Sequence, residues 1–330
     1  MRLYPPLMWL TLCVCVFLCR DESAANEQDA IKGNADQLPT RRVMFIRHGE
    51  SEWNLCFNRG FGPSMLVRIA ASLLKEWRLS FMPDSVFLDS PLSDLGCQQA
   101  KQLLAFVESY PKASEENAMG NNGANFDPAV SECVSILRGE KEASTTVLWT
   151  SNLKRSIATV IIGLWARLNR ATSGGGGGNE KVAIHSFLQE ISTNVDCVAL
   201  ADPLEVPELD LSAPLGDKNG GAVSRYLDPR GNRGNKPVFG KGLTRLQRFS
   251  AAAFRTDCTT IVASGHSLWF KYYFQVRTPP KNVHILPALG TLRLSNTYTK
   301  RSHDARRVGL DRKRKVNYII TITERRRDGT

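Results

Sequence analysis

The stretch RVMFIRHGESEWN, residues 42–54, decides the fold of this chain. Its first five residues, Arg42 to Ile46, form a short apolar run, which predicts a buried β-strand. The run ends at Arg47, His48 and Gly49, and further polar residues follow. Ligands bind beyond the carboxyl ends of parallel strands. A strand that ends in a cation and an imidazole therefore predicts one wall of a ligand site.

Two more strand-like runs end in residues of the same kind. Thr145–Trp149 leads to the segment SNLKRS at 151–156. Thr259–Ala263 leads to the segment SGHS at 264–267. If the three strand ends converge, two arginines and two histidines line one crevice. Such a crevice suits a dianionic group, because the guanidinium fork matches phosphate oxygens.

Helical patterns alternate with strands along the rest of the chain. The predicted helices are Met65–Leu79, Ser93–Tyr110, Leu153–Asn169, Thr244–Phe254 and Leu268–Val276, and the remaining predicted strands are Val182–Leu188, His284–Leu294 and Asn317–Thr323. The last two strands are expected at the edge of the sheet. This alternation predicts an α/β domain with a largely parallel sheet. In the helix 65–79 the apolar residues share one side and the cations the other, which favours a core or lid helix over a membrane-binding one.

Segments rich in Gly, Pro and Asn separate these elements. Residues 111–130 are expected to form a mobile surface loop, and residues 202–239 are expected to be mostly loop. Gly174–Gly178 is a run of five glycines, which cannot pack and predicts a flexible excursion of the chain.

The composition is that of an ordinary globular protein. The 330 residues are 42% hydrophobic and 23% charged, which excludes a wholly disordered chain and a multi-pass membrane protein. The eight cysteines lack CxxC spacing, which excludes zinc fingers and thioredoxin-type motifs. Of the net charge of +11, +7 comes from residues 300–330, which hold eleven Lys or Arg and four Asp or Glu. This basic tail could attract a polyanion, although a solvated C-terminal hairpin is the simpler explanation.

The first 25 residues look like a targeting segment. The apolar run Leu7–Cys19 would be about 20 Å long as a helix, which is short of the ~30 Å hydrocarbon core. That length fits a signal peptide, with small residues at 23–25 for cleavage; an uncleaved membrane anchor and a downstream start codon are alternatives. Residues 26–40 are expected to be a linker. The sequence thus predicts a secretory or membrane-anchored protein, with a cytoplasmic location as the alternative.

Four ordered blocks resemble the histidine phosphatase superfamily, the phosphoglycerate mutase-like proteins. The blocks are RHGESEWN at 47–54, SPLSDLG and QQA between 90 and 100, SNLKRSIAT at 151–159 and GHS at 265–267. The resemblance spans about residues 42–325. It implies a three-layer α/β/α sandwich, with a catalytic domain over 41–325 and a short tail over 326–330.

The resemblance also implies roles for the residues in these blocks. His48 is expected to be the nucleophile that takes the phosphoryl group on a ring nitrogen, because a neutral imidazole splits hydrolysis into two easier displacements. Arg47, Arg155 and His266 are expected to cradle the phosphoryl oxygens. No metal and no other cofactor is required.

Three more residues of these blocks are candidates for hydrogen bonding to the phosphate. They are Ser51, Asn54 and Ser267, although Ser and Asn also cap helices. The other three histidines are interpreted as structural; they are His185, His284 and His303.

The proton donor for the leaving group has two candidates. The family places a glutamate in an L-x-E setting after the strand that follows the second arginine, and Leu188-Gln189-Glu190 matches this pattern. The chain then departs from the family by reading ISTNVD, so Asp196 is the alternative. Either carboxyl group needs a raised pKa to be protonated near neutrality, which partial burial can provide.

The spacing of the first two blocks favours a phosphatase over a mutase. His48 and Pro91 lie 43 positions apart, about twice the usual gap in the family, and a mutase must hold two phosphates without admitting water. The wide spacing reflects an insertion between the first two blocks. The insertion and the glycine run are expected to border the pocket. A mutase and a non-catalytic protein that binds phosphorylated ligands are the alternatives. The expected partner is a small phosphorylated substrate rather than nucleic acid, with membrane association through residues 3–19 left open.

Overall fold

A computed structural model describes most of the predicted catalytic domain. The described residues are 40–60, 62–79, 84–111, 127–173, 180–216, 223–237, 242–277, 283–286 and 319–325 of the 330-residue chain. The predictions for the targeting segment, the linker, the glycine run and the tail at 326–330 lie outside these residues. Within them, every helix is too short or too polar to cross a membrane.

The described residues form one seven-stranded sheet. Its order is β4 (Leu227–Asp228), β3 (Val182–Ile184), β2 (Thr146–Thr150), β5 (Thr260–Gly265), β1 (Thr40–Arg47), β7 (Ile319–Arg325) and β6 (Val283–Leu286). The first five strands are parallel, and β7 and β6 are antiparallel to their neighbours. The prediction of a largely parallel sheet is therefore confirmed.

Strand β7 does not lie at an edge of the sheet. It pairs with β1 from Thr40↔Arg325 to Ile46↔Ile319, and β6 then covers its other side. The prediction that both late strands are edge strands is therefore wrong for β7. The run of β-branched residues at 319–323 suits a strand that has neighbours on both sides.

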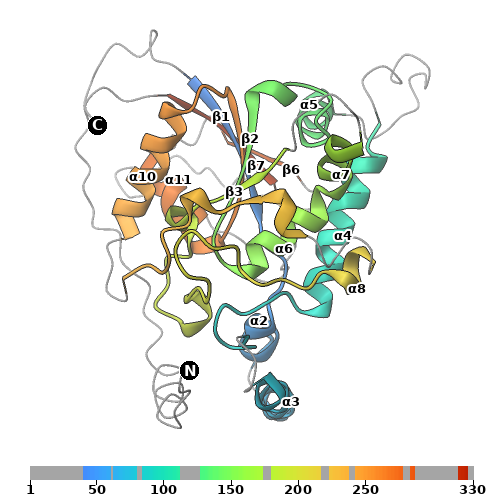
Figure 1. Ribbon diagram of the computed structural model, residues 1–330, viewed down its shortest axis with the longest axis vertical. Coiled ribbons are helices and arrows are strands. Elements are labelled where there is room, and N and C mark those ends of the chain that lie inside the picture. Colours follow the sequence, from blue (N-terminus) through green and yellow to red (C-terminus); the bar gives the residue numbers. More distant parts are fainter. Residues whose placement is uncertain are drawn as a thin grey trace, which may run out of the picture.

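Helices cover both faces of the sheet and make three layers (Figure 1). One face is covered by α4 (Asp94–Ser109), α5 (Pro128–Leu137), α6 (Lys154–Gly163) and α7 (Trp165–Ser173), and the other by α10 (Gly242–Arg255) and α11 (Ser267–Arg277). Alternate residues of β1 enter the two cores, as the period of a strand requires. Met44 and Ile46 pack on the α4–α7 side, and Val43 and Phe45 pack on the α10–α11 side. The predicted α/β/α sandwich is confirmed.

Two predicted segments differ from the structure. The expected loop 111–130 includes the start of α5, which Asp127 caps and Pro128 opens. The predicted helix 153–169 is broken at Leu164 into α6 and α7. At the break, the backbone of Gly163 approaches Leu103 so closely that a Cβ would lie 2.6 Å from its Cδ2. Tertiary packing, rather than helix propensity, sets this boundary.

The insertion after the first block contains two helices, α2 (Glu52–Phe57) and α3 (Pro63–Leu79). The prediction of a helix at 65–79 is confirmed, but its placement in the core is wrong. Ser72 is the one buried residue of α3, and four large apolar side chains of the helix are exposed, those of Leu66, Val67, Leu74 and Trp77. In Figure 1, α3 lies beyond α2 at the end of the molecule.

The remaining described elements are short. They are the helix α8 (Ser212–Leu215) and the 3-10 turns at Ala143–Thr145, Ser186–Leu188, Val195–Cys197, Val223–Tyr226 and Pro229–Gly231. The predicted strand 182–188 ends early, because the chain turns after Ile184. The expectation of mostly loop at 202–239 is confirmed for its described residues.

Candidate active site

Three neighbouring parallel strands end at one edge of the sheet. Strand β5 lies between β1 and β2, and Arg47 at the end of β1 pairs with Gly265 at the end of β5. The backbone N–H of His48 donates to the Gly265 carbonyl at 3.0 Å, and that of Ser151 donates to the Ser264 carbonyl at 3.1 Å. The predicted convergence of the three strand ends is therefore confirmed.

The two predicted histidines lie close together at this edge of the sheet, with their rings tilted by 58°. The ring centroids of His48 and His266 are 4.9 Å apart, and both side chains are buried. The Nδ1 atom of His48 lies 2.6 Å from the carbonyl oxygen of Gly49. Since a carbonyl can only accept, Nδ1 carries the proton. The lone pair of His48 is therefore on Nε2, where it is available to attack.

Burial and neighbouring cations keep both imidazoles neutral. The pKa of His48 lies well below its ordinary value, first because of burial and then because of the guanidinium groups of Arg155 and Arg47. The pKa of His266 is lowered in the same way by burial and by Arg155 and His48. The Nε2 atom of His266 is 2.9 Å from Ser151 Oγ, whereas its buried Nδ1 has no hydrogen-bond partner among the described residues.

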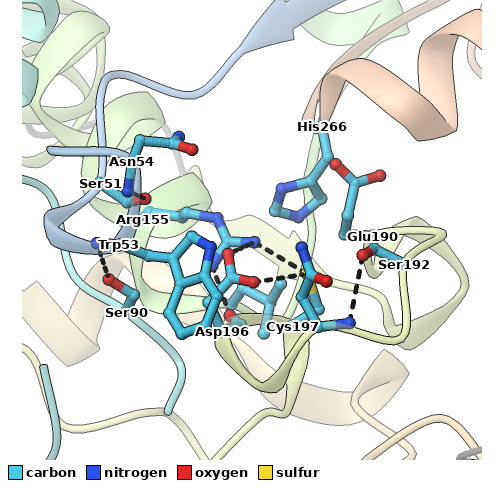
Figure 2. Close-up of polar contacts among 12 residues, drawn as sticks. Ser51, Trp53, Asn54, Ser90, Arg155, Glu190, Ser192, Asp196, Cys197 and His266 are labelled. Atoms are coloured by element: carbon cyan, nitrogen blue, oxygen red, sulfur yellow. Dashed lines mark hydrogen bonds and ion pairs between the residues drawn. The ribbon is translucent and has the colours of Figure 1, made fainter. Parts of the chain in front are cut away.

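Arg155 reaches the same place from the first turn of α6 (Figure 2), and its charge acts on both imidazole rings. Its guanidinium group donates to the Asp196 carbonyl at 2.6 Å and lies 3.2 Å from the carboxylate of the same residue. It also contacts the Cys197 thiol at 3.4 Å. Within the described chain, its buried Nε atom has no partner. The contacts above hold the terminal nitrogens of Arg155, so its Nε–H group is left as a donor for a bound anion.

Glu190 lies beside His266 in Figure 2 and is buried. Its Oε1 atom accepts the backbone N–H groups of Ile191 at 2.9 Å and Trp269 at 3.0 Å. Burial raises the pKa of the Glu190 carboxyl group, and the charge of Arg155 opposes this rise. A carboxyl group with a raised pKa at the site is suited to proton transfer.

Asp196, the alternative proton donor, lies on the other side of Arg155. Burial raises its pKa as well, again against the charge of Arg155. Its carboxylate and its carbonyl both bind that guanidinium group, however, so Asp196 is placed to hold Arg155. The structure brings both candidates to the site and gives them different partners.

The first two sequence blocks support each other through close backbone contacts. The backbone N–H of Ser93 donates to the Glu50 carbonyl at 2.9 Å. A Cβ on Gly49 would lie 2.6 Å from the Gly96 carbonyl oxygen, and one on Gly96 would lie 2.0 Å from the Glu50 carbonyl oxygen. The N–H of Gly49 also donates to Thr159 Oγ1 at 3.0 Å. The glycines therefore allow the loop that carries His48 to pack on α4.

The three candidates for hydrogen bonding to the phosphate lie in different helices or have different partners. Ser51 caps α2, because its Oγ accepts the N–H of Asn54 at 3.2 Å, as the capping alternative predicted. The side chain of Asn54 accepts a hydrogen bond from Asn58. Ser267 is half-buried at the first residue of α11.

Sequence analysis missed Lys236. Its Nζ atom donates to the carbonyl of Glu190 at 2.7 Å and to the carbonyl of Ser192. Its charge lowers the pKa values of Glu190 and His266. Lys236 belongs to the loop-rich segment 202–239, where no periodic pattern marks a residue as part of a site. Among the described residues, there is also no group of three His, Cys, Asp or Glu side chains that could hold a metal ion.

The chain is similar in fold to several solved structures. They include a protein described as an α-ribazole-5'-P phosphatase from Escherichia coli, with 17% identity over 71% of this chain and 77% of that one, at a TM-score of 0.30. A mycobacterial glucosyl-3-phosphoglycerate phosphatase has 15% identity over 71% of this chain and 78% of that one, at a TM-score of 0.29. A phosphoserine phosphatase from Entamoeba histolytica has 15% identity over 70% of this chain and 76% of that one, at a TM-score of 0.28. Neither a protein-family model nor a curated protein sequence matches the chain.

The chain resembles the histidine phosphatase superfamily. This resemblance lies in the order of its four blocks, in the sheet topology and in the meeting of the blocks at one edge of the sheet. At the identities above, the likeness to the solved structures concerns the fold alone. The function of this protein must therefore be argued from its own side chains.

Proposed function

We propose that the protein is a phosphatase that hydrolyses a phosphomonoester through a phosphohistidine on His48. The supporting observation is the position of the His48 ring, 4.9 Å from that of His266, with Nδ1 bound to the Gly49 carbonyl. This arrangement presents a neutral imidazole with a free Nε2 lone pair. It lies in a crevice where cations can hold the phosphoryl group.

In the first step, the Nε2 atom of His48 attacks phosphorus and the P–O bond to the leaving group breaks. Glu190 gives its proton to the departing oxygen, so that the product leaves as an alcohol. In the second step, Glu190 takes a proton from water while the water oxygen attacks phosphorus. The P–N bond then breaks, its electron pair returns to Nε2, and inorganic phosphate leaves.

Charge on the phosphoryl oxygens is offset by groups already in place. Arg47, Arg155 and His266 follow three different strands, and the charges of the two arginines act on both imidazole rings. The buried Nε of Arg155 and Nδ1 of His266 each have no partner within the described residues. An unpartnered buried polar atom costs about 1–3 kcal/mol, and phosphate oxygens would remove that cost.

Two other functions fit parts of the same geometry. A mutase would need room for a second phosphate and exclusion of water, and within α3 no cation is buried. A non-catalytic binder would need the arginines but neither a free His48 Nε2 nor a buried carboxyl group. The presence of both supports an enzyme.

The test is to trap the intermediate. The full-length protein is incubated with ³²P-labelled phosphomonoesters, quenched in alkali, and analysed for an acid-labile label on a histidine peptide. We expect label on His48 in the wild type and none in His48→Ala. Label that persists in His48→Ala would remove this residue from the proposed role.

His185→Gln is the matched control, because this histidine lies among aromatic rings away from His48. It should be labelled like the wild type. A mutase would instead transfer the label to phosphoglycerate faster than to water, which would overturn the phosphatase assignment.

A further inference from the structure

Helix α3 presents an apolar face to the outside of the protein. Leu66 and Val67 are each 70% exposed, Trp77 is 67% exposed and Leu74 is 50% exposed. At 100° per residue, positions 63, 66, 67, 70, 71, 74 and 77 fall on one side of the helix, and each of them is apolar. This side spans the full length of the 17-residue helix. A continuous apolar stripe of this kind marks an interaction surface.

The opposite side of α3 is fixed to the protein by polar contacts. The hydroxyl of buried Ser72 lies 2.7 Å from Cys56 Sγ in α2. The carboxylate of Glu76 accepts Ser85 Oγ at 2.8 Å and the N–H of Val86 at 2.7 Å. These contacts set the rotation of the helix, so its outward apolar face does not result from a loose attachment.

The charges on α3 favour an anionic partner. Glu76 is the one acidic residue of the helix, and it points toward the protein. The cations lie elsewhere: Arg78 falls within the outward side, and Arg68 and Lys75 border it. Arg68 binds the Gly60 carbonyl at 3.0 Å and Lys75 binds Glu52 at 2.9 Å, so both are held near the stripe. The outward side therefore carries apolar residues and cations, with no acidic residue.

We propose that α3 docks this protein on the surface of an anionic lipid bilayer. An amphipathic helix with Leu and Trp on one face and Lys or Arg beside them lies in the plane of the interface, with the apolar side chains among the acyl chains. Trp77 and Arg78 at the end of the helix have the amphipathic character of side chains at the lipid–water boundary. A second copy of the chain fits this face less well, because it would bring the same cations together.

The docking is independent of the proposed phosphatase activity. Among the described residues, the contacts of α3 reach α2 and the segment 85–87 rather than His48 or Arg155. Loss of lipid binding should therefore leave hydrolysis of a soluble phosphomonoester unchanged. The two proposals can fail separately.

The test is co-sedimentation of the full chain with lipid vesicles. The parent protein carries Leu10→Asp and Val14→Asp, so that the apolar run Leu7–Cys19 cannot account for binding. Vesicles of phosphatidylcholine are compared with vesicles that contain about one third phosphatidylserine. We expect the parent to bind the anionic vesicles more tightly.

Variants of the stripe then identify the surface. In Leu66→Ser/Trp77→Ser, the partition coefficient should fall by tenfold or more, since two large apolar side chains are lost. Arg78→Glu should weaken binding only to the anionic vesicles, by about fivefold for each unit of charge. Leu204→Ser is the matched control, because Leu204 is 57% exposed but lies outside α3. It should bind like the parent.

Three results would overturn the proposal. One is a parent protein that stays in the supernatant with both kinds of vesicle, and another is a Leu66→Ser/Trp77→Ser variant that binds as the parent does. The third is a dimer of the parent, measured by light scattering without lipid, that the double variant converts to a monomer; this would assign the stripe to a second copy. Hydrolysis of para-nitrophenyl phosphate by every variant verifies that each is folded.

Discussion

The imidazole rings of His48 and His266 are buried and lie 4.9 Å apart, although the two residues are far apart in the sequence. The contact exists because β1 and β5 are neighbouring parallel strands whose ends pair at Arg47 and Gly265. Two imidazoles at this distance beside two guanidinium groups cannot easily both be protonated. The pair is therefore a neutral nucleophile and a neutral hydrogen-bonding group within a cationic crevice.

This relationship predicts that both rings stay neutral through the usual titration range of histidine. The pKa of each lies well below 6.5, so neither ring should gain a proton as the pH falls from 8 to 5.5. Two-dimensional NMR of the imidazole nitrogens should give constant shifts for both residues, assigned with His48→Ala and His266→Ala. The Nδ1–H tautomer of His48, with an unprotonated Nε2, should be visible in the same spectra. A titration of either ring near 6.5 would contradict the buried geometry.

The leaving group distinguishes the role of Glu190 from that of Asp196. Para-nitrophenolate leaves without a proton, whereas an alkoxide needs one. In Glu190→Gln, kcat/KM for an alkyl phosphate, which reports formation of the phosphohistidine, should fall by about 10²–10⁴, and kcat/KM for para-nitrophenyl phosphate should fall far less. Steady-state kinetics on the two substrates measures the difference.

Asp196→Asn is the comparison for this prediction. Asp196 holds the guanidinium group of Arg155, so its loss should affect phosphate binding and slow both substrates by a similar factor. If Asp196→Asn instead lost activity only on the alkyl phosphate, and Glu190→Gln lost activity on both substrates, the roles of the two carboxyl groups would be exchanged.

Lys236 predicts a shift in the alkaline limb of the pH profile. Its positive charge lowers the pKa of Glu190, so its removal should raise that pKa. The acid form of Glu190 then persists to higher pH, and the alkaline limb of kcat for an alkyl phosphate should move upward in Lys236→Met. Lys236→Arg should keep the wild-type limb. Arg233→Met, an exposed cation of the same segment, is the control and should also leave it unchanged.

The packing of Gly96 predicts a specific loss of the site. In Gly96→Ala, the new Cβ would lie 2.0 Å from the Glu50 carbonyl oxygen, so the loop that carries His48 must move. Overpacking of this kind costs about 1–3 kcal/mol, and a nucleophile displaced by about 1 Å loses roughly 10²-fold in rate. Urea unfolding and kcat measure the two effects. Gln102→Ala is the control, because Gln102 lies on the exposed side of the same helix, α4, and its loss should leave both quantities unchanged.

The sequence was sufficient to predict the sheet and the meeting of the blocks, because both depend on local patterns. Apolar runs such as Arg42–Ile46 mark buried strands, and parallel strands necessarily end at a common edge. Where the first two blocks meet, the backbone N–H of Ser93 donates to the Glu50 carbonyl.

What the sequence could not provide is the direction in which each element faces. The apolar stripe of α3 has the period of a core helix, and tertiary contacts of Ser72 and Glu76 on the opposite side turn it outward. The place of Lys236 depends on the path of a loop without periodicity, and the ion pair of Asp196 with Arg155 depends on two side-chain rotamers. Such features are set by tertiary contacts rather than by local pattern.

His185 predicts a pH dependence of stability that is separate from activity. Its ring stacks on Phe187 at 4.5 Å and lies 4.9 Å from Trp149, and burial lowers its pKa to about 4. The unfolded chain binds a proton near pH 6.5, so stability is lost as the pH falls from 6.5 toward 4 and is fully present above 6.5. By pH 4 this one group should cost about 3 kcal/mol of the free energy of unfolding. Urea unfolding at pH 7 and pH 4 should therefore differ less in His185→Gln than in the wild type. An equal difference in the two proteins would mean that His185 titrates normally in the folded state.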